Sequence, residues 1–394
     1  MSGAIVGLGL TELGKVYGRS STSLAAEAVQ RAVTDAGLTL GDLDGLLVSA
    51  GIKQDVGIGL AGTLGLRELN MLAQVNAFGA TAGVMVAQAV QAIEAGAATT
   101  IACVFADTPL KPHKSAGASW SPASRSGNAG AVVGGMTGWT IVSGAVNPNI
   151  LYALAARRHV EAYGTTSEQL GEIAVAQRAW AAGNPLAQMR EPMTLAEHQE
   201  SRWIAEPLHL LDCCLVSNGA VAVVVTSAER AAELAHPPVH VWGYGQAHGP
   251  RHMQAGSQWG LVTPAARSGP QALRMAGIGV DDVDIVELYD CYTYTVLVTL
   301  EDYGFCAKGE GGDFVSNGRL APGGQLACNT GGGQLSSYYM WGMTPLSEAI
   351  IQARGDGGER QAPRNDVVMV SGNGGILEHH STLVLSPHLR GGTA

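Results

Sequence analysis

The chain has 394 residues, of which 46% are hydrophobic and 14% charged, and its formal net charge is −10 with an isoelectric point near 5.5. This apolar content suffices for a large core, and the length suggests two domains. The negative charge argues against nucleic acid as the main partner, although an anionic cofactor would need only a local basic spot.

The first residues and the apolar segments predict where the protein works. MSGAIVGLGLTELGK has no basic region followed by a long apolar one, so we expect no signal peptide. No apolar stretch approaches the about 20 residues that span a bilayer. The six cysteines are scattered without CxxC pairs, which favours reduced thiols over a metal site or disulfides. We therefore expect a soluble cytoplasmic protein.

Helix-like and strand-like segments alternate over the first part of the chain. Residues 23–38 carry apolar side chains at helical spacing and end near Gly37, and LDGLLVSAG follows as a buried strand. TAGVMVAQAVQAIEAG then reads as an apolar helix, and TTIACVFA reads as another buried strand. This alternation predicts an α/β fold with a parallel sheet covered on both faces.

A repeat lies hidden in this pattern. Residues 32–48 align without a gap with residues 272–288, an offset of 240 positions, so that a helix end, an Ala-Gly turn and a buried strand coincide. Downstream, the helix and strand at 86–105 have counterparts in PLSEAIIQARG and VVMVSG. Two copies predict a duplicated fold with pseudo-two-fold halves, and chance similarity of common α/β turns is the alternative.

The repeat suggests how the chain divides. We expect an N-terminal half at residues 1–235, with a loop insertion near 109–205, and a C-terminal half at 236–394. The Ser- and Gly-rich segment 109–135 is typical of a functional excursion from the sheet, and 151–205 is typical of amphipathic helices.

Several motifs, taken in order, make the chain resemble the thiolase superfamily, most of all the sterol-carrier-type thiolases and their thiolase-like relatives. These motifs cover essentially the whole chain: AIVGLGLTELGK, VNAFGATAGVMVAQAVQAIEAG, DCCLVSNGA, VELYDCYT, NTGGGQLSS and SGNGGI. The resemblance implies a thiolase fold of five layers, αβαβα, built from duplicated halves and forming a homodimer. It also implies a small partner protein with a zinc ribbon and an OB-fold.

A thiolase needs four reactive groups, and this chain has replaced each of them at the matching position. The nucleophilic cysteine falls on Gly79, and the second cysteine falls on Gly372. The active-site histidine falls on Tyr339, and the oxyanion histidine of the sterol-carrier type falls on Tyr289. Without a thiolate no acyl-cysteine intermediate can form at this site.

The resemblance extends to aldolases that cleave steroid side chains as β-hydroxyacyl-CoA thioesters, in which tyrosines replace the nucleophilic cysteine. A base takes the proton of the β-hydroxyl, a ketone leaves, and the remaining acyl-CoA enolate is stabilised and protonated. We expect one of Tyr289 and Tyr339 to be the base, with a pKa lowered by a neighbouring charge or hydrogen bonds, and the other to be the acid or an oxyanion donor. Coenzyme A enters as part of the substrate, with no permanently bound cofactor, and leaves as propionyl-CoA or acetyl-CoA.

Other residues are candidates around this pair. Tyr294 is a further catalytic candidate, although its apolar surroundings favour packing, and Tyr338 and His379 are candidate substrate contacts. Gly79 and Gly372 would line the substrate, with Gly79 opening room for a bulky ketone.

Some motifs and functions stay open. Cys291 and Cys328 are poor substitutes for the nucleophile because neither begins the required helix, and an alternating strand would point only one of His379 and His380 inward. KGEGGDF (308–314) lacks a Walker lysine, so we expect a lid or a partner contact. The alternative functions are a thiolase-like C-acyltransferase or condensing enzyme, and a non-catalytic acyl-CoA-binding subunit of a larger complex.

Overall fold

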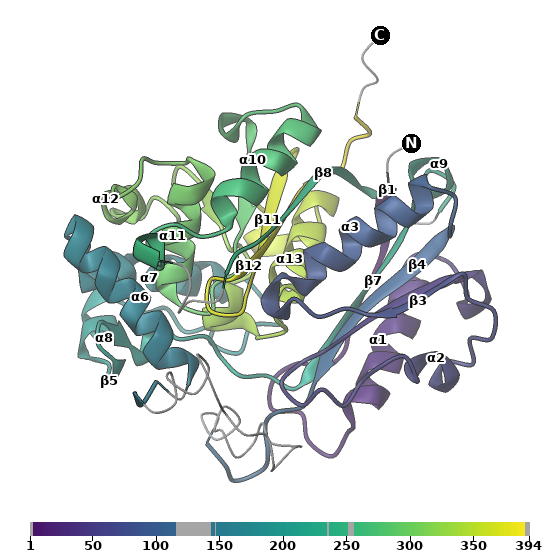
Figure 1. Cartoon of the computed structure of the whole chain (residues 1–394), viewed down its shortest axis with the longest axis horizontal. Coiled ribbons are helices and arrows are strands. Elements are labelled where there is room, and N and C mark those ends of the chain that lie inside the picture. Colours follow the sequence, from purple (N-terminus) through teal and green to yellow (C-terminus); the bar gives the residue numbers. More distant parts are fainter. Residues whose placement is uncertain (1–2, 116–142, 146, 235, 251–255, 391–394) are drawn as a thin grey trace.

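The computed structural model describes residues 3–115, 143–145, 147–234, 236–250 and 256–390, and its scaffold is one ten-stranded sheet (Figure 1). The strands of the first half are β1 (Gly3–Leu10), β2 (Gly45–Ala50), β3 (Met71–Gln74), β4 (Thr100–Asp107) and β7 (Gly219–Ser227). Those of the second half are β8 (Val239–His248), β9 (Ile285–Glu287), β10 (Ala327–Cys328), β11 (Val368–Gly374) and β12 (His379–Ser386).

The two halves are copies of one unit. The sheet order is β10-β9-β11-β12-β8-β1-β7-β4-β2-β3. When the five strands of each half are numbered along the chain, both halves have the order 3-2-4-5-1 from the outer edge to the centre of the sheet. The short turns Leu40–Asp42 and Val280–Asp282 occupy matching places in the two copies. So do Gly37 and Gly277, which end helices with φ of 72° and 70°. The predicted duplication is confirmed, whereas the exact division into two domains stays a prediction.

The sheet is mixed, so the prediction of a parallel sheet is wrong. β2 is parallel to β3 and β4, and β9 is parallel to β10 and β11. However, β4, β7 and β1 pair antiparallel in turn, as do β11, β12 and β8. Apolar strand sequences indicate that both faces of a sheet are covered, but they do not indicate whether neighbouring strands run parallel or antiparallel.

The two halves of the sheet form two layers, and helices outside each half and between the halves complete the five layers that the resemblance implied. The main ones are α1 (Ser21–Asp35), α3 (Thr81–Glu94), α10 (Ala265–Ala276), α11 (Thr293–Tyr303) and α13 (Met343–Arg354). α1 packs on the strands of the first half and α10 on those of the second, while α3 and α13 contact strands of both (Figure 1). Among the described helices, none combines the length and apolar character needed to cross a membrane.

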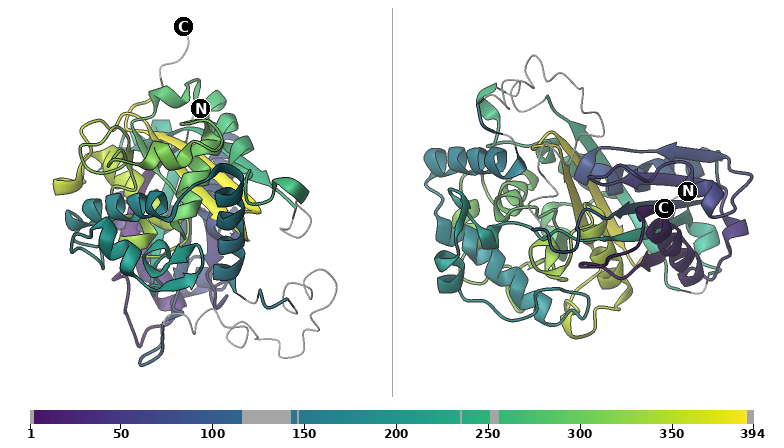
Figure 2. Two further views of the ribbon diagram at one scale, coloured as in Figure 1. Left: turned by 90° about the vertical axis from the view of Figure 1, so that its left-hand side faces the viewer. Right: turned by 90° about the horizontal axis from the view of Figure 1, so that it is seen from below.

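An insertion of helices covers one end of the molecule. It comprises α6 (Pro148–Tyr163), α7 (Ser167–Ala182), α8 (Leu195–Glu200), β5 (Trp203–Ala205) and β6 (Leu208–His209), in agreement with the expected helices. Figure 2 places these teal helices on the side of the C-terminal half, away from α1 and from α2 (Leu60–Thr63). α7 packs against α11 and against α12 (Gly311–Val315). Most of the excursion at 109–135 lies outside the described residues.

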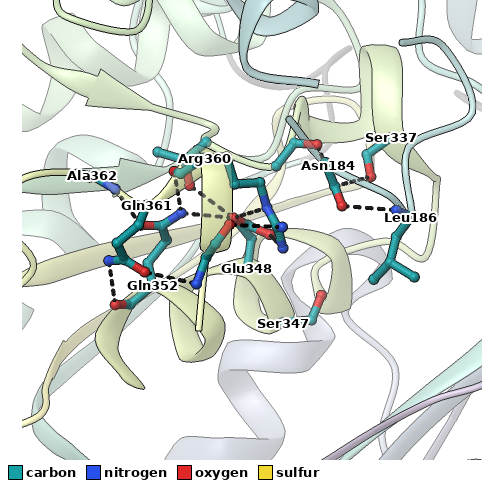
Figure 3. A network of polar contacts seen from close by, with 12 residues as sticks. Asn184, Leu186, Ser337, Ser347, Glu348, Gln352, Arg360, Gln361 and Ala362 are labelled. Atoms are coloured by element: carbon teal, nitrogen blue, oxygen red, sulfur yellow. Dashed lines mark hydrogen bonds and ion pairs between the residues drawn. The ribbon is translucent and has the colours of Figure 1, made fainter. Parts of the chain in front are cut away.

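A buried ion pair fastens α13 to the chain that follows it (Figure 3). Glu348 Oε1 accepts a hydrogen bond from Arg360 Nε at 2.9 Å, and its Oε2 accepts one from Arg360 Nη2 at 3.1 Å. Gln352 Nε2 donates to Glu348 Oε1 at 3.0 Å and to the Arg360 carbonyl at 2.9 Å. Thr330, in the glycine turn before α13, donates to Glu348 Oε1 at 3.1 Å. The pair therefore also holds that turn.

We predict that Glu348→Gln lowers the free energy of unfolding by about 3 kcal/mol, because it leaves the buried Arg360 guanidinium without its countercharge. Glu161→Gln is the matched control, since Glu161 pairs with Arg157 on an exposed helix face, and it should change stability by at most about 0.5 kcal/mol. Urea unfolding of both variants measures this. Equal effects would contradict the role given to the buried pair.

Candidate active site

Two buried tyrosines meet beside the start of α3. Tyr289 follows β9, and Tyr339 lies between the glycine turn and α13. Their hydroxyl oxygens are 2.9 Å apart, within a hydrogen bond in which either group can donate. Their rings meet edge to face with centroids 6.4 Å apart. The structure thus joins the two phenols that the sequence singles out.

The ring of Tyr289 fills the space that a side chain at position 79 would need. Gly79 lies in the turn Phe78–Ala80 that leads into α3. A Cβ at Gly79 would lie 2.3 and 2.4 Å from Tyr289 Cε2 and Cζ, and 2.2 Å from the Asn373 carbonyl oxygen. The expectation that Gly79 opens room for a bulky ketone is therefore wrong in this conformation, because a phenol takes that room.

Gly372 is held by close backbone contacts of its own. It lies in β11, and a Cβ there would be 2.6 Å from Ser381 Oγ and 2.7 Å from the Gly79 carbonyl oxygen. The two positions that carry cysteines in thiolases therefore touch each other here, with no space for a side chain at either.

The carboxylate of Asp290 links the two phenols. Asp290 directly follows Tyr289 and is fully buried. Its oxygens accept hydrogen bonds from the Gln334 amide at 2.9 and 2.8 Å and from the Leu335 amide at 3.2 Å. Those amides belong to the turn that carries Tyr339, so one carboxylate sets how the turn sits against the strand end that carries Tyr289.

The local backbone of this turn depends on glycine. Residues Gly333–Ser337 form a single π-helical turn that begins with Gly333 at φ 59°. A Cβ on Gly333 would lie 2.1 Å from Asp290 Oδ2, so only glycine lets the carboxylate reach the amides. Burial raises the pKa of Asp290 to about 7, even though the amide hydrogen bonds act in the opposite direction.

Burial also keeps both phenols neutral. Desolvation raises the pKa of Tyr289 and of Tyr339 well above 10. The hydrogen bond between them raises the pKa of Tyr289 and lowers that of Tyr339, a smaller effect than burial. The expectation that a neighbour lowers the pKa of one phenol overall is therefore wrong. The pair consists of two neutral groups, each able to donate and to accept.

Thiols lie near the pair without forming a nucleophile. The Cys214 amide donates to the Cys291 carbonyl at 3.0 Å, and all six cysteines of the chain are free. Burial raises the pKa of Cys291 to about 12 and that of Cys214 and Cys328 well above 9. Across the described residues, no group of three His, Cys, Asp or Glu side chains is arranged to hold a metal ion.

The two other candidate tyrosines point elsewhere. The Tyr294 hydroxyl donates to the Gly260 carbonyl, and the Tyr338 hydroxyl lies 2.7 Å from Ser347 Oγ of α13. Both rings are buried. These contacts favour packing for both, and any contact of Tyr338 with substrate stays a prediction.

The consecutive histidines of β12 face opposite ways, as expected. His380 is buried, with Nδ1 2.9 Å from Ser268 Oγ of α10. His379 is half-buried, and its ring stacks on Phe78 with centroids 6.2 Å apart. Its Nδ1 lies 3.2 Å from Nδ1 of His248. His379 therefore lies next to the turn that carries Gly79, and its role in binding stays a prediction.

The KGEGGDF loop binds a carboxylate of the chain itself. The amides of Gly309 and Gly311 donate to Glu301 Oε1 at 3.0 and 2.9 Å. Its resemblance to an anion-binding loop thus has an internal, structural explanation.

Sequence reasoning missed two residues beside the phenols, Tyr152 of α6 and Asn373 of β11. The Tyr152 hydroxyl donates to the Gly375 carbonyl at 3.0 Å and accepts from Asn373 Nδ2 at 3.1 Å. Burial raises the pKa of Tyr152, and Cys291 and Tyr339 add to the rise, which places it beside the pair. Asn373 could have been noticed as a polar residue within the glycine-rich motif SGNGGI, whereas Tyr152 belongs to no motif that the sequence shows.

Comparisons with known proteins find relatives along the whole chain. The family model described as thiolase C-terminal domain-like matches residues 245–387. The chain is 38% identical to a steroid side-chain-cleaving aldolase of Thermomonospora curvata, over 94% of this chain and 95% of the relative. It is 36% identical to a 17-hydroxy-3-oxo-4-pregnene-20-carboxyl-CoA lyase of Mycobacterium tuberculosis, over 94% and 96% respectively.

Solved structures lead to the same fold. An Ltp2–ChsH2(DUF35) aldolase superposes with a TM-score of 0.86 at 37% identity, covering 98% of this chain and 97% of that chain. A monomeric SCP2-thiolase-like protein type 1 from Mycobacterium smegmatis superposes with a TM-score of 0.76, covering 100% and 79%. Its identity of 19% supports the fold alone.

We predict that Gly79→Ala lowers the free energy of unfolding by about 1–3 kcal/mol, because the added methyl overlaps the Tyr289 ring. Gly62→Ala, in α2, is the matched control, since a Cβ there has nothing within 4 Å. Urea unfolding compares the two variants. Unchanged stability of Gly79→Ala would contradict the packing described for the site.

Proposed function

The chain belongs to the thiolase superfamily as a carbon–carbon lyase, and we propose that it cleaves a β-hydroxyacyl-CoA thioester of a steroid side chain. The products are a ketone and a short acyl-CoA, either propionyl-CoA or acetyl-CoA. The relatives at 38% and 36% identity support this substrate class through their names. The hydrogen-bonded phenols, at the positions where thiolases carry histidines, are the observation that carries the proposal.

Retro-aldol cleavage moves one proton from the β-oxygen to the α-carbon. In our proposal the β-hydroxyl gives its proton to the Tyr289 oxygen while Tyr289 gives its own proton to the Tyr339 oxygen. Tyr339 in turn gives its proton to the α-carbon, which receives the electron pair of the breaking carbon–carbon bond. The β-carbon becomes the ketone carbonyl, and both phenols end neutral.

The electrostatics of the site favour this relay over a tyrosinate base. Burial raises the pKa of each phenol well above 10, so a free phenolate would be scarce at neutral pH. The hydrogen bond between them raises the pKa of Tyr289 and lowers that of Tyr339, while burial raises both overall. In this proposal Tyr289 takes the oxygen side and Tyr339 the carbon side. Acyl transfer has no comparable support, because Gly79 and Gly372 offer no nucleophile.

We expect phenylalanine at either position to lower kcat by about a hundredfold or more, because the relay is then interrupted. Tyr163→Phe is the control, since this tyrosine lies on an exposed part of α6. The assay measures ketone and acyl-CoA release from a β-hydroxyacyl-CoA, with the partner protein present, and iodoacetamide should leave the wild-type rate unchanged. Full activity in both Tyr289→Phe and Tyr339→Phe would contradict the mechanism.

The assembly and setting are part of the proposal. We propose a cytoplasmic homodimer with a small zinc-ribbon and OB-fold partner, in which coenzyme A enters only as part of the substrate. The related aldolase structure, whose name pairs Ltp2 with ChsH2(DUF35), supports a partner. β3 forms one outer edge of the sheet, and Leu72 on it is 42% exposed, which supports pairing with a second copy at this edge.

We predict that Leu72→Lys shifts the protein from dimer to monomer, because an edge charge opposes strand pairing. Leu389→Lys is the control, since Leu389 is an exposed leucine outside the sheet. Sedimentation at several concentrations measures the state. A dimer of unchanged affinity in Leu72→Lys would rule out this edge as the interface.

A further inference from the structure

Asn373 carries a buried hydrogen-bond acceptor that the folded chain does not use. The residue is 3% exposed, and its Oδ1 has no hydrogen-bond partner among the described residues. Leaving a buried carbonyl oxygen unpaired costs about 1–3 kcal/mol. Such groups in native proteins call for an explanation, and a ligand that supplies the missing donor is one.

The orientation of this amide follows from its neighbour. The Tyr152 hydroxyl has one proton, which it donates to the Gly375 carbonyl at 3.0 Å. It can therefore only accept from Asn373, so the NH₂ end of the amide must face Tyr152, at 3.1 Å. The opposite assignment would place two acceptors together. With this assignment, the free Oδ1 points away from Tyr152.

Asn373 also lies against the proposed reacting groups. A Cβ on Gly79 would lie 2.2 Å from the Asn373 backbone carbonyl oxygen and 2.3–2.4 Å from ring carbons of Tyr289. The Asn373 backbone and the Tyr289 ring are therefore close neighbours. Tyr152, which holds the amide, in turn interacts with Tyr289 and Tyr339 electrostatically. The unpaired acceptor therefore belongs to the surroundings of the phenol pair and not to a remote part of the core.

We propose that Asn373 is a substrate-orienting residue whose Oδ1 accepts a hydrogen bond from a donor of the bound acyl-CoA thioester. In the proposed reaction the one proton of the β-hydroxyl goes to Tyr289, so the donor left for Asn373 is the amide N–H of the pantetheine arm nearest the thioester. Tyr152 is the positioning residue that keeps the acceptor end turned to the ligand. The inference rests on the proposed function, because it takes its ligand from it.

The test compares binding of two thioesters by calorimetry, with the partner protein present. One is 3-hydroxy-3-methylbutyryl-CoA, a small tertiary β-hydroxyacyl-CoA, and the other is 3-methylbutyryl-CoA, which lacks only the hydroxyl. Asn373→Leu should raise Kd by about tenfold, because a donor of the ligand loses its acceptor. An equal loss for both thioesters supports the pantetheine amide as the donor, and a loss confined to the hydroxylated thioester would contradict this assignment.

Two further variants keep the test decisive. Tyr152→Phe frees the Asn373 amide to turn and should weaken binding of both thioesters by about threefold, even if Asn373→Leu folds poorly. Asn70→Leu, at an exposed asparagine before β3, should change neither Kd. Unchanged binding in both Asn373→Leu and Tyr152→Phe overturns the inference while leaving the lyase proposal in place. If the wild-type protein binds neither thioester, that result counts against both the inference and the lyase proposal.

Discussion

The packing of the Tyr289 ring against the backbone of Gly79 is the constraint on which the rest of the site depends. Ring carbons of Tyr289 lie 2.3–2.4 Å and the Asn373 carbonyl oxygen 2.2 Å from the place of a Gly79 Cβ, so the phenol and the backbone together close this position to a side chain. With no nucleophile at positions 79 and 372, the groups present can move protons and stabilise charge, and they cannot form a covalent acyl intermediate there.

The second phenol is fixed by a different device. Asp290 binds two amides of the glycine turn, and the Glu348–Arg360 pair holds the same turn through Thr330. Buried carboxylates are costly unless their hydrogen bonds are satisfied, and here that cost is offset by backbone amides and a guanidinium. The result is a rigid turn that presents Tyr339 to Tyr289 at hydrogen-bond distance, as pre-organised catalysis requires.

Much of this arrangement was predictable from the sequence, and the physical reasons for the failures are specific. The duplication could be predicted because a helix end, a glycine turn and a buried strand recur at a fixed offset. Strand direction could not, because apolar patterning is the same for parallel and antiparallel strands covered on both faces. The phenol pair followed from motif positions, but its pKa values did not, because burial dominates them. Tyr152 and Asn373 were missed because only folding brings α6 against the end of β11.

The central claim is that two neutral phenols relay one proton, and the pH dependence of kcat tests it most directly. With both phenols neutral throughout, log kcat for cleavage should stay flat from about pH 7.5 to about pH 9.5. A tyrosinate base would instead make kcat rise about tenfold for each pH unit over this range, since the reactive phenolate fraction would grow in proportion. A flat profile supports the relay, and a slope of one would contradict it.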